Sequence, residues 1–147
     1  MKQLFLSLTL IATVALTAAA KPAPVAEPSV EKTFSQIFAG ASHVTWSKEK
    51  GQFMKASFLW GDHQTVAYFE NNGKLIGSIR GLFFNQLPLT VIRMFNSEFA
   101  GHTVIEVREI SNEEGTSYSL VTESKDKKYR LRLSAQGNLL DKERVKK

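Results

Sequence analysis

Apolar side chains recur with a helical period in two segments of the chain, residues 30–38 and 91–99. In each segment they fall on one face of a helix with 3.6 residues per turn, and a glycine follows shortly after the last of them. The pattern therefore predicts two short amphipathic helices. Their apolar positions are Val30, Phe34, Ile37 and Phe38 in the first, and Val91, Phe95 and Phe99 in the second.

After each predicted helix, apolar and polar residues alternate in four runs that are separated by turn residues. Alternation is typical of strands with one buried face, and the Asn-Gly step at residues 72–73 is a strong hairpin signal. Because the turns are short, neighbouring strands must be antiparallel. The predicted strands are residues 43–48, 52–60, 64–70 and 74–80 after the first helix, and 103–110, 116–123, 128–134 and 138–145 after the second.

The two halves of the chain also match each other in register. An offset of 61 residues aligns the helices, for example Phe34 with Phe95, and an offset of 64 aligns the later strands. We therefore predict an α+β fold of two tandem repeats, residues 30–86 and 87–147. Each repeat is a helix followed by a four-stranded antiparallel meander, with the helices packed on one sheet face. The pattern does not decide whether the repeats share one continuous sheet or form two adjoining sheets.

The N-terminus has the pattern of a secretory signal peptide. One lysine precedes an apolar run at residues 4–16, and small residues at 18–20 fit a cleavage site. The run is shorter than the roughly 20 residues that span a bilayer. We predict a signal peptide at residues 1–20, a proline-rich linker at 21–29 and one soluble periplasmic or secreted domain at 30–147. The alternative is an uncleaved amphipathic or membrane-anchoring helix.

Residues that carry catalysis or bind metals are sparse. The chain contains no cysteine, which excludes disulfides, thiolate metal sites and cysteine nucleophiles. The spacing of the histidines matches no metal motif, and no nucleophile elbow or phosphate-binding glycine loop is present. We therefore predict no enzyme activity, no cofactor and no metal. An unrecognised hydrolase would have to use one of the three histidines, His43, His63 or His102.

Charge is distributed unevenly along the chain. Residues 21–124 carry a net charge of −2, whereas residues 125–147 carry nine Lys or Arg against three Asp or Glu. A basic patch can bind nucleic acid, acidic lipid or an acidic partner, and export makes nucleic acid an unsuitable partner. The simplest interpretation of the basic residues is a solvated strand face.

The alternation also predicts which residues face away from the helices. In residues 128–133 the apolar positions must face the helix, so the basic positions face outward. Transferring this phase to the first half places apolar and aromatic residues outward, where they form a candidate surface for a partner protein. The alternatives are cover by the other half, by the linker or by a second copy in a homodimer. The predicted binding residues are Phe53, Leu59, Val66, Tyr68, Lys128, Arg130 and Arg132.

Several of these features together resemble a known family. A signal peptide precedes two helix-and-strand units, a Tyr-Phe-x-x-x-Gly-x-Leu hairpin lies at residues 68–75, and Leu-Pro at 87–88 opens the second unit. Over residues 29–145 this resembles the PepSY-like, beta-lactamase-inhibitor-like periplasmic proteins of Bacteroidetes. The resemblance implies helices packed on an antiparallel sheet, a cell-envelope location and a sheet face that docks another protein. It transfers no inhibitory residue to this chain.

We therefore predict a non-enzymatic exported binding module that docks or restrains another envelope protein, whose identity the sequence does not reveal. The basis is an outward apolar face without a reactive group of residues beside it. The alternative is a periplasmic protein that binds or senses a small ligand, either between the two halves or against the basic residues at 128–132.

Overall fold

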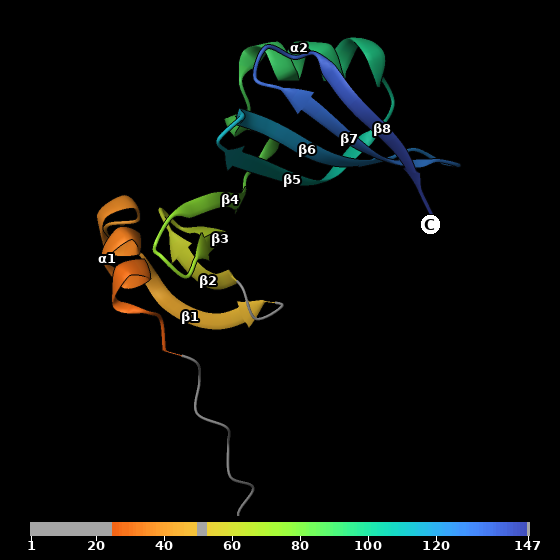
Figure 1. The fold of residues 1–147 in the computed structure, drawn as a ribbon. Helices are drawn as coiled ribbons and strands as arrows, with labels where there is room; N and C mark the ends of the chain where they lie inside the picture. The colour runs from red at the N-terminus through yellow and green to blue at the C-terminus, as the bar shows by residue number, and fades with distance from the viewer. Residues whose placement is uncertain (1–24, 50–52, 147) are drawn as a thin grey trace, which may run out of the picture.

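The computed structural model describes residues 25–49 and 53–146. The described chain forms two α-helices, one short 3-10 helix and eight strands (Figure 1). The predicted signal peptide and residues 21–24 of the predicted linker lie outside the described residues. The elements are α1 (Pro28–Ile37), β1 (Ser42–Glu49), β2 (Phe53–Trp60), β3 (His63–Glu70), β4 (Leu75–Gly81), η1 (Phe84–Gln86), α2 (Leu89–Glu98), β5 (Thr103–Asn112), β6 (Gly115–Glu123), β7 (Lys128–Ser134) and β8 (Leu139–Val145).

All eight strands belong to one antiparallel sheet, in the order β1 to β8. The predicted fold class, two tandem repeats that each consist of a helix and a four-stranded meander, is therefore wrong. The pairing that overturns it joins β4 to β5, from Gly77↔Asn112 to Gly81↔Arg108. Backbone groups left unpaired at the edge of β4 would be costly to bury, and β5 satisfies them. The fold is one eight-stranded antiparallel sheet with two α-helices in the described chain.

Both helices cover the same face of this sheet, which we call the inner face. Its buried positions alternate along β2 and β3 with half-buried ones, as expected for strands with one covered face. The first core lies between α1 and strands β1 to β4, and the second lies between α2 and strands β5 to β7. Figure 1 shows α1 beside the first four strands and α2 beside the last four.

The helices form where the sequence placed its two apolar stripes. Val30 and Phe34 of α1 are buried against β2 and β3, and Val91 and Phe95 of α2 are buried against β6 and β7. Pro28 occupies the first turn of α1, where its missing N–H is no loss. The helical spacing therefore identified Val30, Phe34 and Phe38 as buried, whereas Ile37, the fourth apolar position predicted for the first helix, is 42% exposed.

Two tight turns hold the N-terminal ends of the helices against the sheet. Gly73, in the turn between β3 and β4, has a φ of +96°, and a Cβ there would lie 2.7 Å from the carbonyl oxygen of Ser29. Gly137, between β7 and β8, has a φ of +85°, and a Cβ would lie 2.6 Å from the carbonyl oxygen of Thr90. Only glycine allows both the left-handed backbone and this close approach.

Candidate binding surfaces

The sheet face opposite the helices, which we call the outer face, carries the apolar residues predicted for the first half. Their neighbours in the same strands, such as Met54 and Phe69, are buried in the first core. In the β2–β3 pairing, Tyr68 lies opposite Lys55 and Val66 lies opposite Ser57. This register places Phe53 diagonally from Tyr68 and Leu59 diagonally from Val66. Each of the four predicted apolar residues is half-buried. The four residues are Phe53, Leu59, Val66 and Tyr68.

The structure adds two isoleucines to this surface that the sequence analysis missed. Val66 pairs with Ile79 of β4, and Ile79 pairs with Ile110 of β5. These three β-branched side chains form an apolar row that crosses the junction between the two halves. The alternation of apolar and polar residues predicted the strands that carry these isoleucines, but it did not show that β4 pairs with β5.

Beyond this row the outer face carries charged residues of both signs, because Glu106 is ion-paired with Arg108 and Asp141 pairs across β7 and β8 with Arg132. Arg108 of β5 and Arg132 of β7 both pair with Ser119 of β6, and therefore flank it on the outer face. Arg130 forms an ion pair with Glu143 at 3.0 Å, which fixes that side chain against β8. The basic residues predicted from the sequence thus lie on the same face as the apolar ones. They do not join them in one cluster, because β7 is four strands from β3, about 19 Å at the usual strand spacing.

Lys128, the third predicted basic residue, lies at the end of β7 beside a surface hollow. The hollow has a volume of about 510 Å³ and is lined by Asp126, Lys128, Arg144, Val145 and Lys146. Three of these five side chains are cationic. The hollow is therefore basic.

A polar cluster occupies the inner face at the junction between the two cores. Arg80 of β4 forms an ion pair with Glu109 of β5 at 2.9 Å, and its guanidinium lies 5.6 Å from the ring centre of Trp60. Tyr118 of β6 is cross-strand from Glu109. Burial raises the pKa of the Tyr118 hydroxyl, and the Glu109 carboxylate raises it further. The cluster connects both halves through side chains as well as through the sheet.

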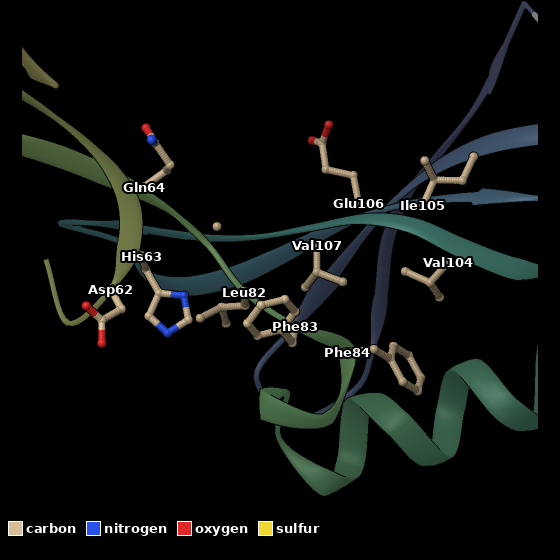
Figure 2. Close-up of a pocket in the computed structure, with 11 residues that line it drawn as sticks. Asp62, His63, Gln64, Leu82, Phe83, Phe84, Val104, Ile105, Glu106 and Val107 are labelled. Carbon is tan, nitrogen blue, oxygen red and sulfur yellow. The ribbon is translucent and has the colours of Figure 1, made fainter. Parts of the chain in front are cut away.

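A cleft of about 490 Å³ lies where β4 ends and the chain turns toward α2 (Figure 2). One wall comes from the β2–β3 turn and the start of β3, at Asp62 to Gln64. The other comes from β5, at Val104 to Val107, and the floor is formed by Leu82, Phe83 and Phe84. Phe83 is 71% exposed. Among the described large apolar side chains, only Val25, which precedes α1, is more exposed, at 81%.

The three histidines lie in different parts of the structure. His43 is on β1, where its ring is within 3.2 Å of the Ser42 hydroxyl, and His63 contacts Gln86 at 3.3 Å. His102 lies between the rings of Phe99 and Tyr129, and both of its ring nitrogens are buried with no hydrogen-bond partner among the described residues. Within residues 25–49 and 53–146, no group of three His, Cys, Asp or Glu side chains has a geometry that could hold a metal ion.

Comparison with solved structures places this fold among proteins from Bacteroides. A BLIP-like protein from Bacteroides fragilis superposes with a TM-score of 0.73 and 22% identity, over 83% of this chain and 88% of that one. A DUF2874 family protein from Bacteroides ovatus gives 0.73 and 23%, over 83% and 89%. A protein from Bacteroides eggerthii, provisionally described as periplasmic, gives 0.72 and 18%, over 83% and 91%.

The chain shares its fold with these Bacteroides proteins. The predicted resemblance to beta-lactamase-inhibitor-like proteins is confirmed at the level of fold by the BLIP-like neighbour, whereas the PepSY part of it stays a prediction. No protein-family model matches the chain, and no curated protein matches it. None of the helices in the described part of the chain is long and apolar enough to cross a membrane.

Proposed function

We propose that this protein is a non-enzymatic binding module of the periplasm that docks another protein on the outer face of its sheet. The observation that carries this proposal is the continuous apolar row Val66–Ile79–Ile110 on the sheet face that, within the described chain, neither helix covers. Solvated sheet faces usually carry polar side chains, so a row of β-branched residues across three strands favours a protein partner.

The charge of the face adds to its selectivity. Arg108 lies beside the row on β5 and Arg132 lies two strands away on β7. Their acidic neighbours are Glu106 and Asp141, so a partner that covers both regions has to match paired charges next to apolar side chains. Tyr68 stands opposite Gly77, which has no side chain, and therefore offers its ring to a partner. The fold shared with a BLIP-like protein and with a protein provisionally described as periplasmic supports the same function and location.

The test compares outer-face variants with a matched variant elsewhere. The chain from Lys21 onward is immobilised and exposed to native envelope extract, and captured proteins are identified by mass spectrometry. We expect one enriched protein whose capture is lost in Tyr68→Ala and in Arg132→Glu. It should be retained in Leu89→Ser, because Leu89 is 59% exposed at the start of α2, on the opposite side of the sheet. Equal capture by all variants would refute the outer face as the docking surface.

Small-ligand binding is a second candidate, and one observation favours it. The hollow beside Lys128 has space for a small molecule and combines Lys128, Arg144 and Lys146 with a single acid, Asp126. An anionic ligand fits this charge. Thermal unfolding should then shift upward with such a ligand and shift less in Lys128→Gln. Unchanged unfolding temperatures across anionic ligands would exclude this candidate.

A further inference from the structure

One glycine on the outer face is not required by the fold. Gly81 ends β4 and pairs with Arg108 of β5, and its φ is not positive. A Cβ added at Gly81 would meet only the carbonyl oxygen of Gln64, at an ordinary contact distance of 3.8 Å. Glycine weakens a strand, because it loses more conformational freedom on folding than other residues and has no side chain to pack. Such a glycine often marks a place where another molecule approaches the backbone closely.

The other glycine of β4 provides a contrast. Gly77 also lies on the outer face, opposite Asn112, but a Cβ there would lie 2.8 Å from the carbonyl oxygen of Ser111. The close approach of β5 therefore explains why residue 77 is glycine. No such contact in the described chain explains Gly81, so the missing side chain at this position points to a role in binding.

The missing side chain at Gly81 connects the outer face with the cleft. Gln64 of β3 and Arg108 of β5 flank Gly81 on the outer face, so Gly81 is a low point between two long side chains. Gly81 and Gln64 also line the cleft of about 490 Å³, which extends to Phe83. Figure 2 shows Gln64 pointing to one side of the sheet and Phe83 pointing to the other. The cleft therefore leads from the outer face to apolar side chains beyond the end of β4.

The lining of the cleft favours a neutral aromatic side chain. Phe83 is 71% exposed and Ile105 is 51% exposed, so a ring that contacts both would remove their apolar surface from water. The described lining contains no Lys or Arg, and the Asp62 carboxylate has no ion-pair partner among the described residues. An anionic occupant is therefore disfavoured, whereas an N–H or O–H group can donate to Asp62. Tryptophan and tyrosine combine a ring with such a donor.

We infer that this cleft receives a tryptophan or tyrosine side chain of the protein that docks on the outer face. The side chain passes over Gly81, and its ring packs on Phe83 and Ile105. Its N–H or O–H group donates to the Asp62 carboxylate. The anchor rests on the proposed function, since it requires a protein on the outer face. Ile79 faces the same side as Gly81, two residues away on β4, so the apolar row and the anchor are continuous.

Blocked amino acids test the cleft itself. N-acetyl-tryptophanamide and N-acetyl-tyrosinamide are titrated into the isotope-labelled chain from Lys21 onward and followed by NMR. We expect saturable shifts of the amides at residues 62–64, 81–83 and 105, with a Kd of about 1 mM. The leucine probe should bind more weakly, and the glutamate probe should not bind. Absence of these shifts with both aromatic probes would overturn the inference, and so would equal affinity for the leucine or glutamate probe.

Protein variants provide the second test. Gly81→Val fills the low point and spares the fold, because a Cβ has room there and valine suits a strand. Gly81→Val and Phe83→Ser should each weaken binding of the tryptophan probe about tenfold, with urea midpoints no lower than about that of the wild type for Gly81→Val. Ser117→Val is the matched control, because Ser117 lies on the outer face of β6, outside the cleft. Wild-type affinity in both Gly81→Val and Phe83→Ser would refute the anchor.

Capture from envelope extract distinguishes the anchor from the docking surface as a whole. We expect Gly81→Val to lose the same protein that Tyr68→Ala loses. Loss in Tyr68→Ala but not in Gly81→Val would refute the anchor and leave the docking surface standing. Capture that neither variant changes would refute the docking surface. If the aromatic probes still bind in that case, the cleft is a site for a small aromatic molecule, and a partner protein is not the source of the ring.

Discussion

The two halves of the sheet have similar elements but different chemistry. The core under α1 is built from aromatic rings, with Phe34 5.2 Å from Trp46 and 4.9 Å from Phe58 between ring centres. The core under α2 is mainly aliphatic on the strand side, with Leu120, Leu131 and Leu133 among its buried residues. The comparison shows that a helix can be held on a sheet by either type of packing, provided that apolar residues alternate along the strands.

The outer faces of the two halves differ more than their cores. The first half presents half-buried apolar side chains, whereas the second presents Arg130 and Arg132, both exposed. Core positions must be apolar in both halves to stabilise the fold, but outward positions carry no such requirement. The difference between the outer faces is therefore where we look for function.

The largest expected effect comes from truncating a large buried side chain in each core. Phe69→Ala should lower the free energy of unfolding by about 4 kcal/mol and Leu131→Ala by about 3 kcal/mol, since both side chains are fully buried. The two tryptophans, Trp46 and Trp60, both lie in the first half, so fluorescence reports that half and circular dichroism reports the whole sheet.

Because the sheet is continuous, we expect Leu131→Ala to move the fluorescence midpoint in urea as well as the dichroism midpoint. A fluorescence transition identical to that of the wild type would show that the halves unfold independently. It would also show that the β4–β5 pairing contributes little to stability.

The turns beneath the helices provide the second test. Gly73→Ala and Gly137→Ala should each lower the free energy of unfolding by about 2 kcal/mol, because the new Cβ meets a helix carbonyl at a strained φ. Gly40→Ala is the control: its φ is +80°, yet a Cβ would have no neighbour within 4 Å. We expect about 1 kcal/mol there. Equal losses at all three positions, measured by urea unfolding, would show that the helix contact has no effect of its own.

The junction between the halves should be sensitive to alkaline pH. The folded-state pKa of Tyr118 is raised above its ordinary value of about 10, mainly by burial. In the unfolded chain the hydroxyl ionises first, so stability is present below pH 10 and is lost as the pH rises through the folded-state pKa. Urea midpoints should therefore fall above pH 10 in the wild type and fall less in Tyr118→Phe. Parallel pH profiles of the two proteins would show that ionisation of Tyr118 does not cause the loss of stability.

The same junction carries a charge pair whose coupling can be measured. In a double-mutant cycle of Arg80→Met and Glu109→Gln, we expect a coupling of about 1 kcal/mol, since the two side chains are only 30% and 21% exposed. A coupling near zero would mean that backbone pairing alone joins the halves.

The smallest effect is expected in the second half, at an ammonium above two rings. The Lys142 amine lies 4.6 Å from the Tyr129 ring centre and 5.3 Å from that of Phe99. Lys142→Gln should lower the free energy of unfolding by about 0.5 kcal/mol. Lys146→Gln, which makes no such ring contact in the described structure, should leave the urea midpoint unchanged. Equal midpoints for both variants would show that the cation–π contact of Lys142 does not stabilise the fold.

Much of the local structure could be predicted from the order of residues. Each of the eight strands was predicted with ends within two residues of the observed ones, because alternation records directly which side chains face a core. The helix stripes identified Val30, Phe34, Val91 and Phe95 as buried. The phase transferred between the halves placed Tyr68 and Arg132 on the same outer face.

The order of residues was sufficient to place the helices and strands and most of the side chains that each one buries, because these depend on side-chain period. That β4 pairs with β5 emerged only in the folded chain, and with it the single sheet, the apolar row through Ile79 and Ile110, and the cleft where β4 ends. Strand pairing is made by backbone N–H and C=O groups, which are the same in every residue but proline. The choice of partner strand therefore has no local signature, and it depends on how the whole chain packs.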